Sequence, residues 1–166
     1  MTKRILIIFL SLLLLFMFGC AGKNDDIEQP VNFYYHNSLL SEENFDRIIV
    51  SEIREGAGFT KEELVGLYLR GPQSEELENP FPEGLRLVSV SIKGKRVKIT
   101  VSRLLGRLDG IQLTLACSCL SATLFDLYGC QTVEIVSEGQ TIDGKPSIII
   151  NKDDLALTDS SYVSGG

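Results

Sequence analysis

The chain has 166 residues, of which 44% are hydrophobic and 23% are charged, and this composition is typical of one globular domain with short appendages. Its formal net charge is −6, and it has no lysine- and arginine-rich block of the kind that follows a phosphate backbone, so we expect no nucleic acid partner. An acidic surface is also repelled by an anionic membrane face. Any contact with a membrane therefore has to come from an apolar segment.

The N-terminus carries such an apolar segment, with the flanks of a secretory signal peptide. Lys3 and Arg4 precede the apolar run 5–18, and Gly19 and Cys20 follow it. A basic start, a short apolar stretch and small residues at its end are typical of a segment that is cleaved during export. This segment is therefore left out of the predicted fold.

The cysteine that follows a small residue resembles the end of a bacterial lipoprotein signal. On this interpretation residues 1–19 are the signal peptide, and Cys20 becomes the new N-terminus and carries the lipid, with palmitate as an acyl chain. The alternative is an uncleaved anchor, because the 18 residues from Ile5 to Gly22 reach the lower limit for a membrane span. Both alternatives attach the chain to the outer face of the cell membrane, with its remainder outside the cytoplasm.

The rest of the chain divides into a tether, one domain and a tail. Residues 20–30 are polar after the cysteine and end in a proline, which indicates a short lipid-anchored tether. Periodic apolar patterns then continue over residues 31–151, which we predict to form one domain. Residues 152–166 are polar and are predicted to be a fraying tail.

Two strands open the predicted domain. The β-branched and aromatic residues of 31–35 and of 47–53 indicate strands. The polar segment 38–46 between them is predicted to be a turn or a short helix.

A helix is predicted over residues 60–70. Thr60 and Glu63 have the spacing of a capping box, in which the two side chains satisfy free backbone N–H groups. Gly71 and Pro72 end the helix. Its apolar face consists of Leu64, Leu67 and Tyr68.

An antiparallel hairpin is predicted over residues 85–102, around a tight turn at 93–95. Apolar and polar residues alternate along both arms, and this pattern indicates one buried face. The apolar residues of that face are Val88, Val90, Ile92, Val97, Ile99 and Val101. The preceding connection, 71–84, is predicted to be an ordered part of the domain in which only 73–79 is free to vary.

Residues 111–129 fit two patterns. The first half alternates like a strand, but the whole length favours a helix, because 19 residues is long for a strand and Gly129 marks an end. Only Asp126 is charged, so we expect a mostly buried helix. Its apolar stripe consists of Leu113, Cys117, Leu120, Leu124 and Leu127. Two further strands are predicted at 132–136 and 147–150.

The predicted order of elements is β-β-α-β-β-α-β. This order is typical of an α+β fold, with two helices packed on one small, mostly antiparallel sheet.

No residue pattern predicts catalysis or a cofactor. His36 is the only histidine, and we predict that it lies in an exposed loop after the first strand. A general base needs a nucleophile and an orienting group beside it, and no pattern in the sequence supplies them. The paired glutamates are predicted to be solvated. We therefore expect a protein that is not an enzyme, with no catalytic residues and no cofactor.

Three cysteines remain if Cys20 is lipidated, namely Cys117, Cys119 and Cys130. Three cysteines with no nearby histidine fall short of a structural zinc site, and two residues apart on a helix point to nearly opposite sides. We predict buried thiols and no metal. The alternative is a disulfide that joins Cys130 to Cys117 or to Cys119.

Several short motifs together resemble the GerMN domain, which occurs in sporulation and spore germination proteins of Gram-positive envelopes. The motifs are Leu67 to Pro72 at the end of the first helix, Pro82-Glu83-Gly84 before the hairpin, Thr123-Leu124 in the second helix, Gly129, and Val133-Glu134-Ile135. The resemblance covers about residues 31–151. It implies a fold similar to the ring-building motif of sporulation channel proteins, whose neighbouring domains pack into oligomers.

The resemblance also implies a function. It predicts a non-enzymatic, extracytoplasmic lipoprotein that acts as an assembly or adaptor protein in sporulation or in germination. Its partners would be the membrane, through the lipid, and a protein of the envelope, self-association included. The alternative is a module that binds peptidoglycan fragments or a small solute, and this predicts a concave pocket with convergent polar groups.

Overall fold

The structure is a computed structural model, and it describes residues 29–38 and 48–155. The predicted signal peptide, Cys20 and most of the tether lie outside the described residues. So do all but the first residue of the turn or short helix predicted at 38–46, and residues 156–166 of the predicted tail.

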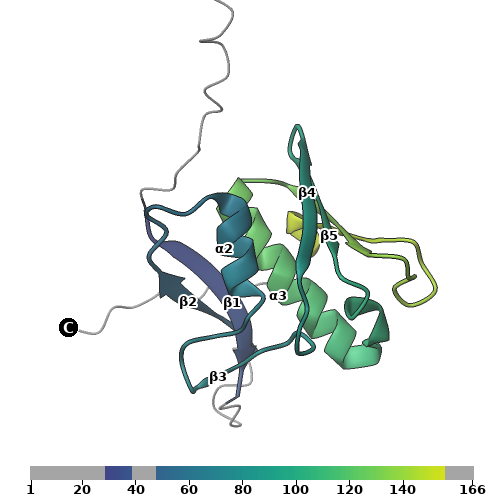
Figure 1. Cartoon of the computed structure of the whole chain (residues 1–166), viewed down its shortest axis with the longest axis horizontal. Helices are drawn as coiled ribbons and strands as arrows, with labels where there is room; N and C mark the ends of the chain where they lie inside the picture. The colour runs from purple at the N-terminus through teal and green to yellow at the C-terminus, as the bar shows by residue number, and fades with distance from the viewer. Residues whose placement is uncertain (1–28, 39–47, 156–166) are drawn as a thin grey trace, which may run out of the picture.

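The described strands form two sheets (Figure 1). The first has the order β2-β1-β3 and is antiparallel, whereas the second has the order β4-β5-β6-β7, in which β5 and β6 run parallel. The strands are β1 (Val31–Asn37), β2 (Ile49–Arg54), β3 (Leu77–Glu78), β4 (Leu87–Lys93), β5 (Arg96–Val101), β6 (Thr132–Ser137) and β7 (Ile148–Asn151). The α+β class is confirmed, although the strands divide into two small sheets instead of joining in one.

Helix α3 (Gly110–Tyr128) forms the core between the sheets. It contacts β1 on one side and β6 on the other, and every residue from Leu120 to Phe125 is buried. Among the described helices only α3 is long and apolar enough to cross a membrane, but this burial makes it the core helix of a folded domain. Gly129 ends the helix in the left-handed conformation, with a φ of 61°, as predicted.

Helix α2 (Lys61–Tyr68) begins as the sequence predicts. The Glu63 N–H donates to Thr60 Oγ1 at 3.3 Å, and the Thr60 N–H donates to the Glu63 carboxylate at 2.8 Å. This reciprocal pair is the predicted capping box. After the helix, Gly71 turns the chain with a φ of 108°, which a residue with a Cβ rarely adopts.

Two side chains connect the helices to the edge of β1. Thr123 Oγ1 on α3 accepts a hydrogen bond from the Tyr34 N–H at 3.0 Å, and the Tyr68 hydroxyl on α2 donates to the Tyr34 carbonyl at 2.8 Å. Strand β3 pairs with β1 only at His36 and Asn37. The helices therefore satisfy backbone groups of β1 that β3 does not reach.

The predicted hairpin is present as β4 and β5, but its first arm is only partly buried. The buried residues of β5 are Val97, Ile99 and Val101. Val88 is exposed because a bulge between Leu87 and Ser89 shifts the register, so that Leu87 takes the place opposite Val101. Ile92 is 59% exposed because the hairpin turn projects beyond the helices (Figure 1). The prediction of one continuous buried face is therefore wrong for Val88 and Ile92.

The connection 71–84 is ordered, as predicted, and Glu52 on β2 holds part of it in place. The Glu52 carboxylate accepts hydrogen bonds from the backbone N–H groups of Gln73 at 2.9 Å and Ser74 at 2.8 Å. The segment 73–79 also contains β3, which pairs with β1. The backbone of this segment is therefore attached to the first sheet, and the freedom predicted for its side chains stays a prediction.

Arg54 completes this attachment. Its Nε donates to the Glu52 carboxylate at 2.7 Å, and its Nη2 donates to the Gly71 carbonyl at 2.8 Å. The guanidinium also lies over the Phe33 ring, 5.2 Å from the ring centroid. Arg54 thus links β2, the end of α2 and the aromatic core through one side chain.

Two short 3-10 helices complete the described chain, η1 (Leu105–Arg107) before α3 and η2 (Lys152–Asp154) after β7. The Lys152 N–H donates to the Gln131 carbonyl at 2.9 Å. The first residues of the predicted tail therefore pack against the domain.

Candidate functional site

His36 lies within β1 and not in the exposed loop predicted for it, because the strand is two residues longer than expected. Its Nδ1 is 3.1 Å from Glu78 Oε2, and the two residues face each other across β1 and β3. The His36 side chain is 20% exposed. In the described part of the chain its ring contacts a carboxylate and no nucleophile, so the pair serves to hold β3 against β1.

The three cysteines Cys117, Cys119 and Cys130 are free thiols, and all are buried as predicted. Burial raises the pKa of Cys117 and of Cys119 to about 12, and it also raises the pKa of Cys130. A thiol with a raised pKa stays protonated, and a protonated thiol is a weak nucleophile and a weak metal ligand. Residues 29–38 and 48–155 contain no group of three or more His, Cys, Asp or Glu that could hold a metal ion.

The paired glutamates that the structure describes do not meet across a cleft, and the pair Glu42 and Glu43 lies outside the described residues. Glu62 and Glu63 lie at the exposed start of α2, and Glu75 and Glu76 lie in the exposed connection before β3. Hydrogen bonds from the backbone and side chain of Thr60 lower the pKa of Glu63, which belongs to the helix cap. The described side chains that could take part in a reaction therefore lie apart from one another. The candidate site is instead sought on the surface.

Strand β2 shows an inverted polarity that makes it the candidate site. The side chains of Glu52 and Arg54 are each only 12% exposed, whereas Ile53 between them is 68% exposed. Successive residues of a strand point to opposite faces. The charged pair therefore faces the core side of the sheet, and the isoleucine faces outward.

Among the described strands, none pairs with the outer edge of β2. The Asn37 N–H donates to the Ile48 carbonyl at 2.9 Å, and in an antiparallel ladder this pattern repeats at every second residue. The backbone groups of Ile49, Ser51 and Ile53 therefore point away from β1. We call these three residues the β2 edge.

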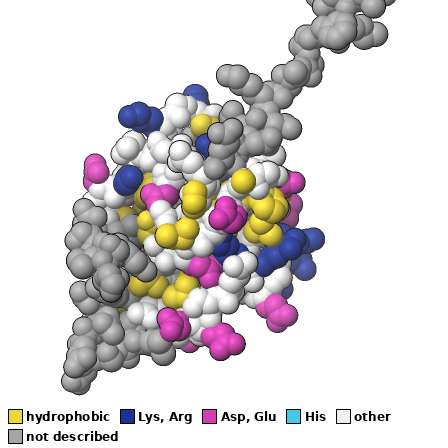
Figure 2. Space-filling model, turned by 90° about the vertical axis from the view of Figure 1, so that its left-hand side faces the viewer, with side chains coloured by type: hydrophobic (Ala, Val, Ile, Leu, Met, Phe, Trp, Pro, Cys, Tyr) yellow, Lys and Arg dark blue, Asp and Glu magenta, His cyan; other side chains and the backbone are white. Residues whose placement is uncertain are grey.

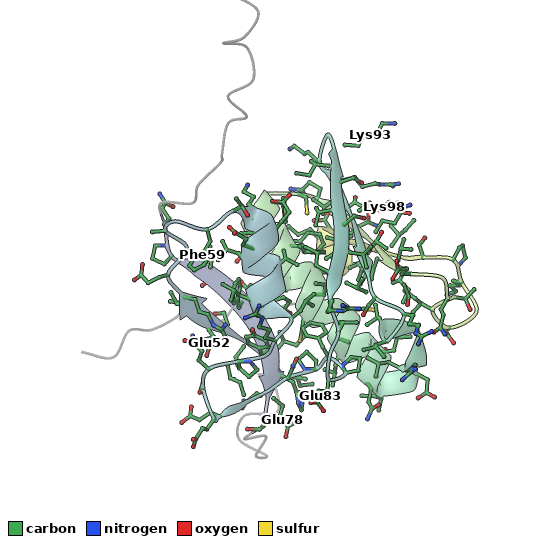
Figure 3. The ribbon with its side chains drawn as sticks, viewed as in Figure 1. Glu52, Phe59, Glu78, Glu83, Lys93 and Lys98 are labelled. Atoms are coloured by element: carbon green, nitrogen blue, oxygen red, sulfur yellow. The ribbon has the colours of Figure 1, made fainter. Side chains whose placement is uncertain are left out.

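The surroundings of the β2 edge combine apolar and acidic side chains. Figure 2 looks at the molecule from the side of β2 and shows hydrophobic side chains gathered among acidic ones. Phe59, which is exposed in the loop after β2, lies on the same side (Figure 3). An open strand edge beside exposed apolar groups is the arrangement to which another protein binds.

Sequence reasoning does not identify the β2 edge, because its pattern points the other way. In Glu52-Ile53-Arg54 an isoleucine stands between two charged residues, and alternation alone would turn the isoleucine inward. The partners that stabilise the buried charges, such as the Gln73 and Gly71 backbone groups, lie far along the chain. The only local signal is a charged pair two residues apart in a strand.

Comparisons with known proteins give one matching family and one similar solved structure. A family model described as "Germane: Sporulation and spore germination" matches residues 33–143. A 2.5 Å crystal structure of a candidate lipoprotein from Clostridium perfringens superposes with a TM-score of 0.46 at 19% sequence identity, covering 82% of this chain and 95% of that one. No curated protein matches the chain.

Proposed function

Because the chain belongs to the sporulation and spore germination family named Germane, we propose that it is a non-enzymatic assembly or adaptor protein of a spore-forming bacterium. It acts on the outer face of the cell membrane, to which Cys20 attaches it through a lipid. The basic and apolar start of the chain supports this attachment.

The observation that carries the proposal is the outward isoleucine of the β2 edge. Ile53 is 68% exposed on a strand whose outer backbone groups have no strand partner among the described residues. An exposed apolar side chain at an open edge favours contact with a second protein, which gains main-chain hydrogen bonds and apolar burial together. A second copy of this chain is one such partner, in line with the predicted resemblance to a ring-building motif.

The arrangement of the reactive side chains supports a role without catalysis. The ring of His36 is paired with Glu78, and the cysteines are buried with raised pKa values. Neither group lies in the β2 edge. The β2 edge is therefore separate from the histidine and from the three described cysteines.

Deletion of the gene is expected to lower spore yield or germination, and a chain with Ile53→Asp should fail to restore either. A charge at a desolvated contact costs about 2 kcal/mol or more, which weakens binding roughly 30-fold. The matched control is Ile111→Asp, since Ile111 is 80% exposed but lies at the start of α3 and not on a sheet edge. Full restoration by Ile53→Asp, at the same protein level as the control, would contradict the proposed contact.

The lipid anchor has its own test. Mass spectrometry of the mature chain from membranes is expected to show an N-terminal Cys20 with a lipid mass, and Cys20→Ala should abolish that mass. Globomycin, which blocks lipoprotein signal cleavage, should cause the uncleaved chain to accumulate. An unprocessed and unmodified Met1 in untreated cells would show that the uncleaved anchor is correct instead.

A further inference from the structure

The turn of the β4–β5 hairpin lies at the same end of the domain as the residue at which the described chain begins. Near that beginning, Asn32 Nδ2 is 3.4 Å from Asp126 Oδ2, close to the C-terminal end of α3. Just beyond the same end of α3, the Gln131 N–H donates to the Lys95 carbonyl in the hairpin at 2.8 Å. Figure 1 shows the hairpin turn and the beginning of the described chain in the upper part of the domain. Figure 3 shows Glu78 and Glu83 at the opposite end.

The hairpin turn is basic although the chain as a whole is acidic. Its second arm and turn contain four cationic residues within six positions, Lys93, Lys95, Arg96 and Lys98, against a formal net charge of −6 for the chain. This short cluster is an exception to the expectation that the chain has no lysine- and arginine-rich block and can meet a membrane only through an apolar segment. Figure 3 shows Lys93 and Lys98 pointing outward from the hairpin.

One carboxylate offsets part of this charge, at the base of the hairpin. Glu134 on β6 lies 3.0 Å from Lys98 Nζ and 4.0 Å from an Arg96 nitrogen. Lys93 and Lys95 form no ion pair with any described residue, so the turn itself keeps its positive charge. Beside them, Ile92 is 59% exposed. We call residues 92–96 the hairpin tip.

We propose that the hairpin tip binds anionic lipid headgroups of the membrane to which the chain is attached. This inference rests on the proposed membrane attachment upstream of the domain. Lysines next to an exposed isoleucine match such a surface, because the ammonium groups meet headgroup phosphates while the apolar side chain enters the interface. The acidic residues at the far end of the domain are repelled by the same membrane, and the two effects orient the domain.

The length of the attached segment favours the membrane over a separate partner. Nine residues lead from Cys20 to Gln29, and they span at most about 30 Å when fully extended. The tip is thereby confined near the lipid surface, and this confinement raises its effective concentration there. A tip that faced away from the attached end would gain nothing from the tether.

The test uses a tryptophan as a local probe, because the chain has no tryptophan of its own. Full-length Ile92→Trp protein is reconstituted in vesicles of phosphatidylcholine, with or without phosphatidylglycerol. We expect the tryptophan emission to shift to the blue, and to be quenched by brominated lipid, only when phosphatidylglycerol is present. Ile111→Trp, whose probe lies at the other end of α3, should show neither change.

Charge removal and salt complete the test. Lys93→Gln with Lys95→Gln in the Ile92→Trp protein should raise the phosphatidylglycerol content needed for half of the shift, because two lysines near an anionic surface contribute roughly 30-fold in affinity. High salt should have the same effect. An equal shift with phosphatidylcholine alone, or no shift with either lipid, would overturn the proposal.

Two other outcomes show whether lipid or a second copy of the chain binds the hairpin tip, and whether the anchor or only the docking fails. A blue shift that depends on protein concentration in detergent, without vesicles, would show that a second copy binds the tip, and would overturn the lipid proposal. Flotation of the vesicles reports the attachment independently of the fluorescence. Protein that does not float refutes the proposed anchor, whereas floating protein without a shift refutes only the docking of the tip.

Discussion

Replacement of Leu124 by alanine is expected to lower the free energy of unfolding by about 3 kcal/mol, because it removes apolar atoms from a site that cannot collapse. Leu124 is fully buried on α3, and sheets lie on both sides of that helix. The strands of each sheet are hydrogen-bonded to one another, so neither sheet can move in to fill the cavity. Urea denaturation of the mature chain, followed by circular dichroism, measures the effect.

The matched control for Leu124 is Ile111→Ala in the same helix. Ile111 is 80% exposed, so its truncation should change the stability by no more than about 0.5 kcal/mol. Equal losses for the two variants would mean that α3 is not the central layer. The comparison therefore tests the arrangement of the two sheets as well as the burial of one residue.

Replacement of Arg54 by alanine is the second large change, with an expected loss of about 3 kcal/mol in the free energy of unfolding. The guanidinium donates to Glu52 and to the Gly71 carbonyl, and its removal leaves the largely buried Glu52 carboxylate without its cation. The loss should also loosen the connection 71–84. Hydrogen exchange of the Gln73 and Ser74 amides, which donate to Glu52, reports this directly.

Two further variants serve as controls for the Arg54→Ala result. Arg70→Ala removes an exposed arginine and should leave stability within about 0.5 kcal/mol of the parent. The double variant Glu52→Gln with Arg54→Met should be more stable than Arg54→Ala alone, because it leaves no unpaired buried charge. If Arg54→Ala is as stable as Arg70→Ala, the pair does not hold the connection.

The local elements of this fold can be predicted from sequence, because their signals are short-range. Thr60 and Glu63 form the cap that their spacing predicts, and Gly129 ends α3 in the conformation that glycine favours. The resemblance to the GerMN domain is confirmed by the family match over residues 33–143. These features depend on neighbours within a few positions, or on motifs in a fixed order.

The division into two sheets is not predictable in the same way. It depends on α3 entering between strands that are far apart in the chain, with Thr123 bonded to Tyr34 across 89 positions. The bulge beside Leu87 likewise reverses the inward and outward alternation on which the hairpin prediction depends. His36 falls in a strand because it pairs with Ile49 of β2 and with Glu78 of β3, and a two-residue strand such as β3 has no recognisable pattern.

The candidate site is the least predictable part. Alternation places isoleucines inward and charges outward, and β2 does the reverse because distant backbone groups stabilise Glu52 and Arg54. The predicted lipidation site, Cys20, follows from a local motif and stays a prediction for the experiments described above.

The bonds from Thr123 and Tyr68 to Tyr34 have a consequence for stoichiometry. They occupy one side of β1, and β3 covers the end of that side with two residues, so among the described residues the longer open edge of the first sheet is that of β2, with six residues. A two-residue edge offers few backbone groups to a further strand, so an added strand is expected beside β2. Contacts made through the first sheet are therefore favoured on one side, which favours discrete complexes over fibrils.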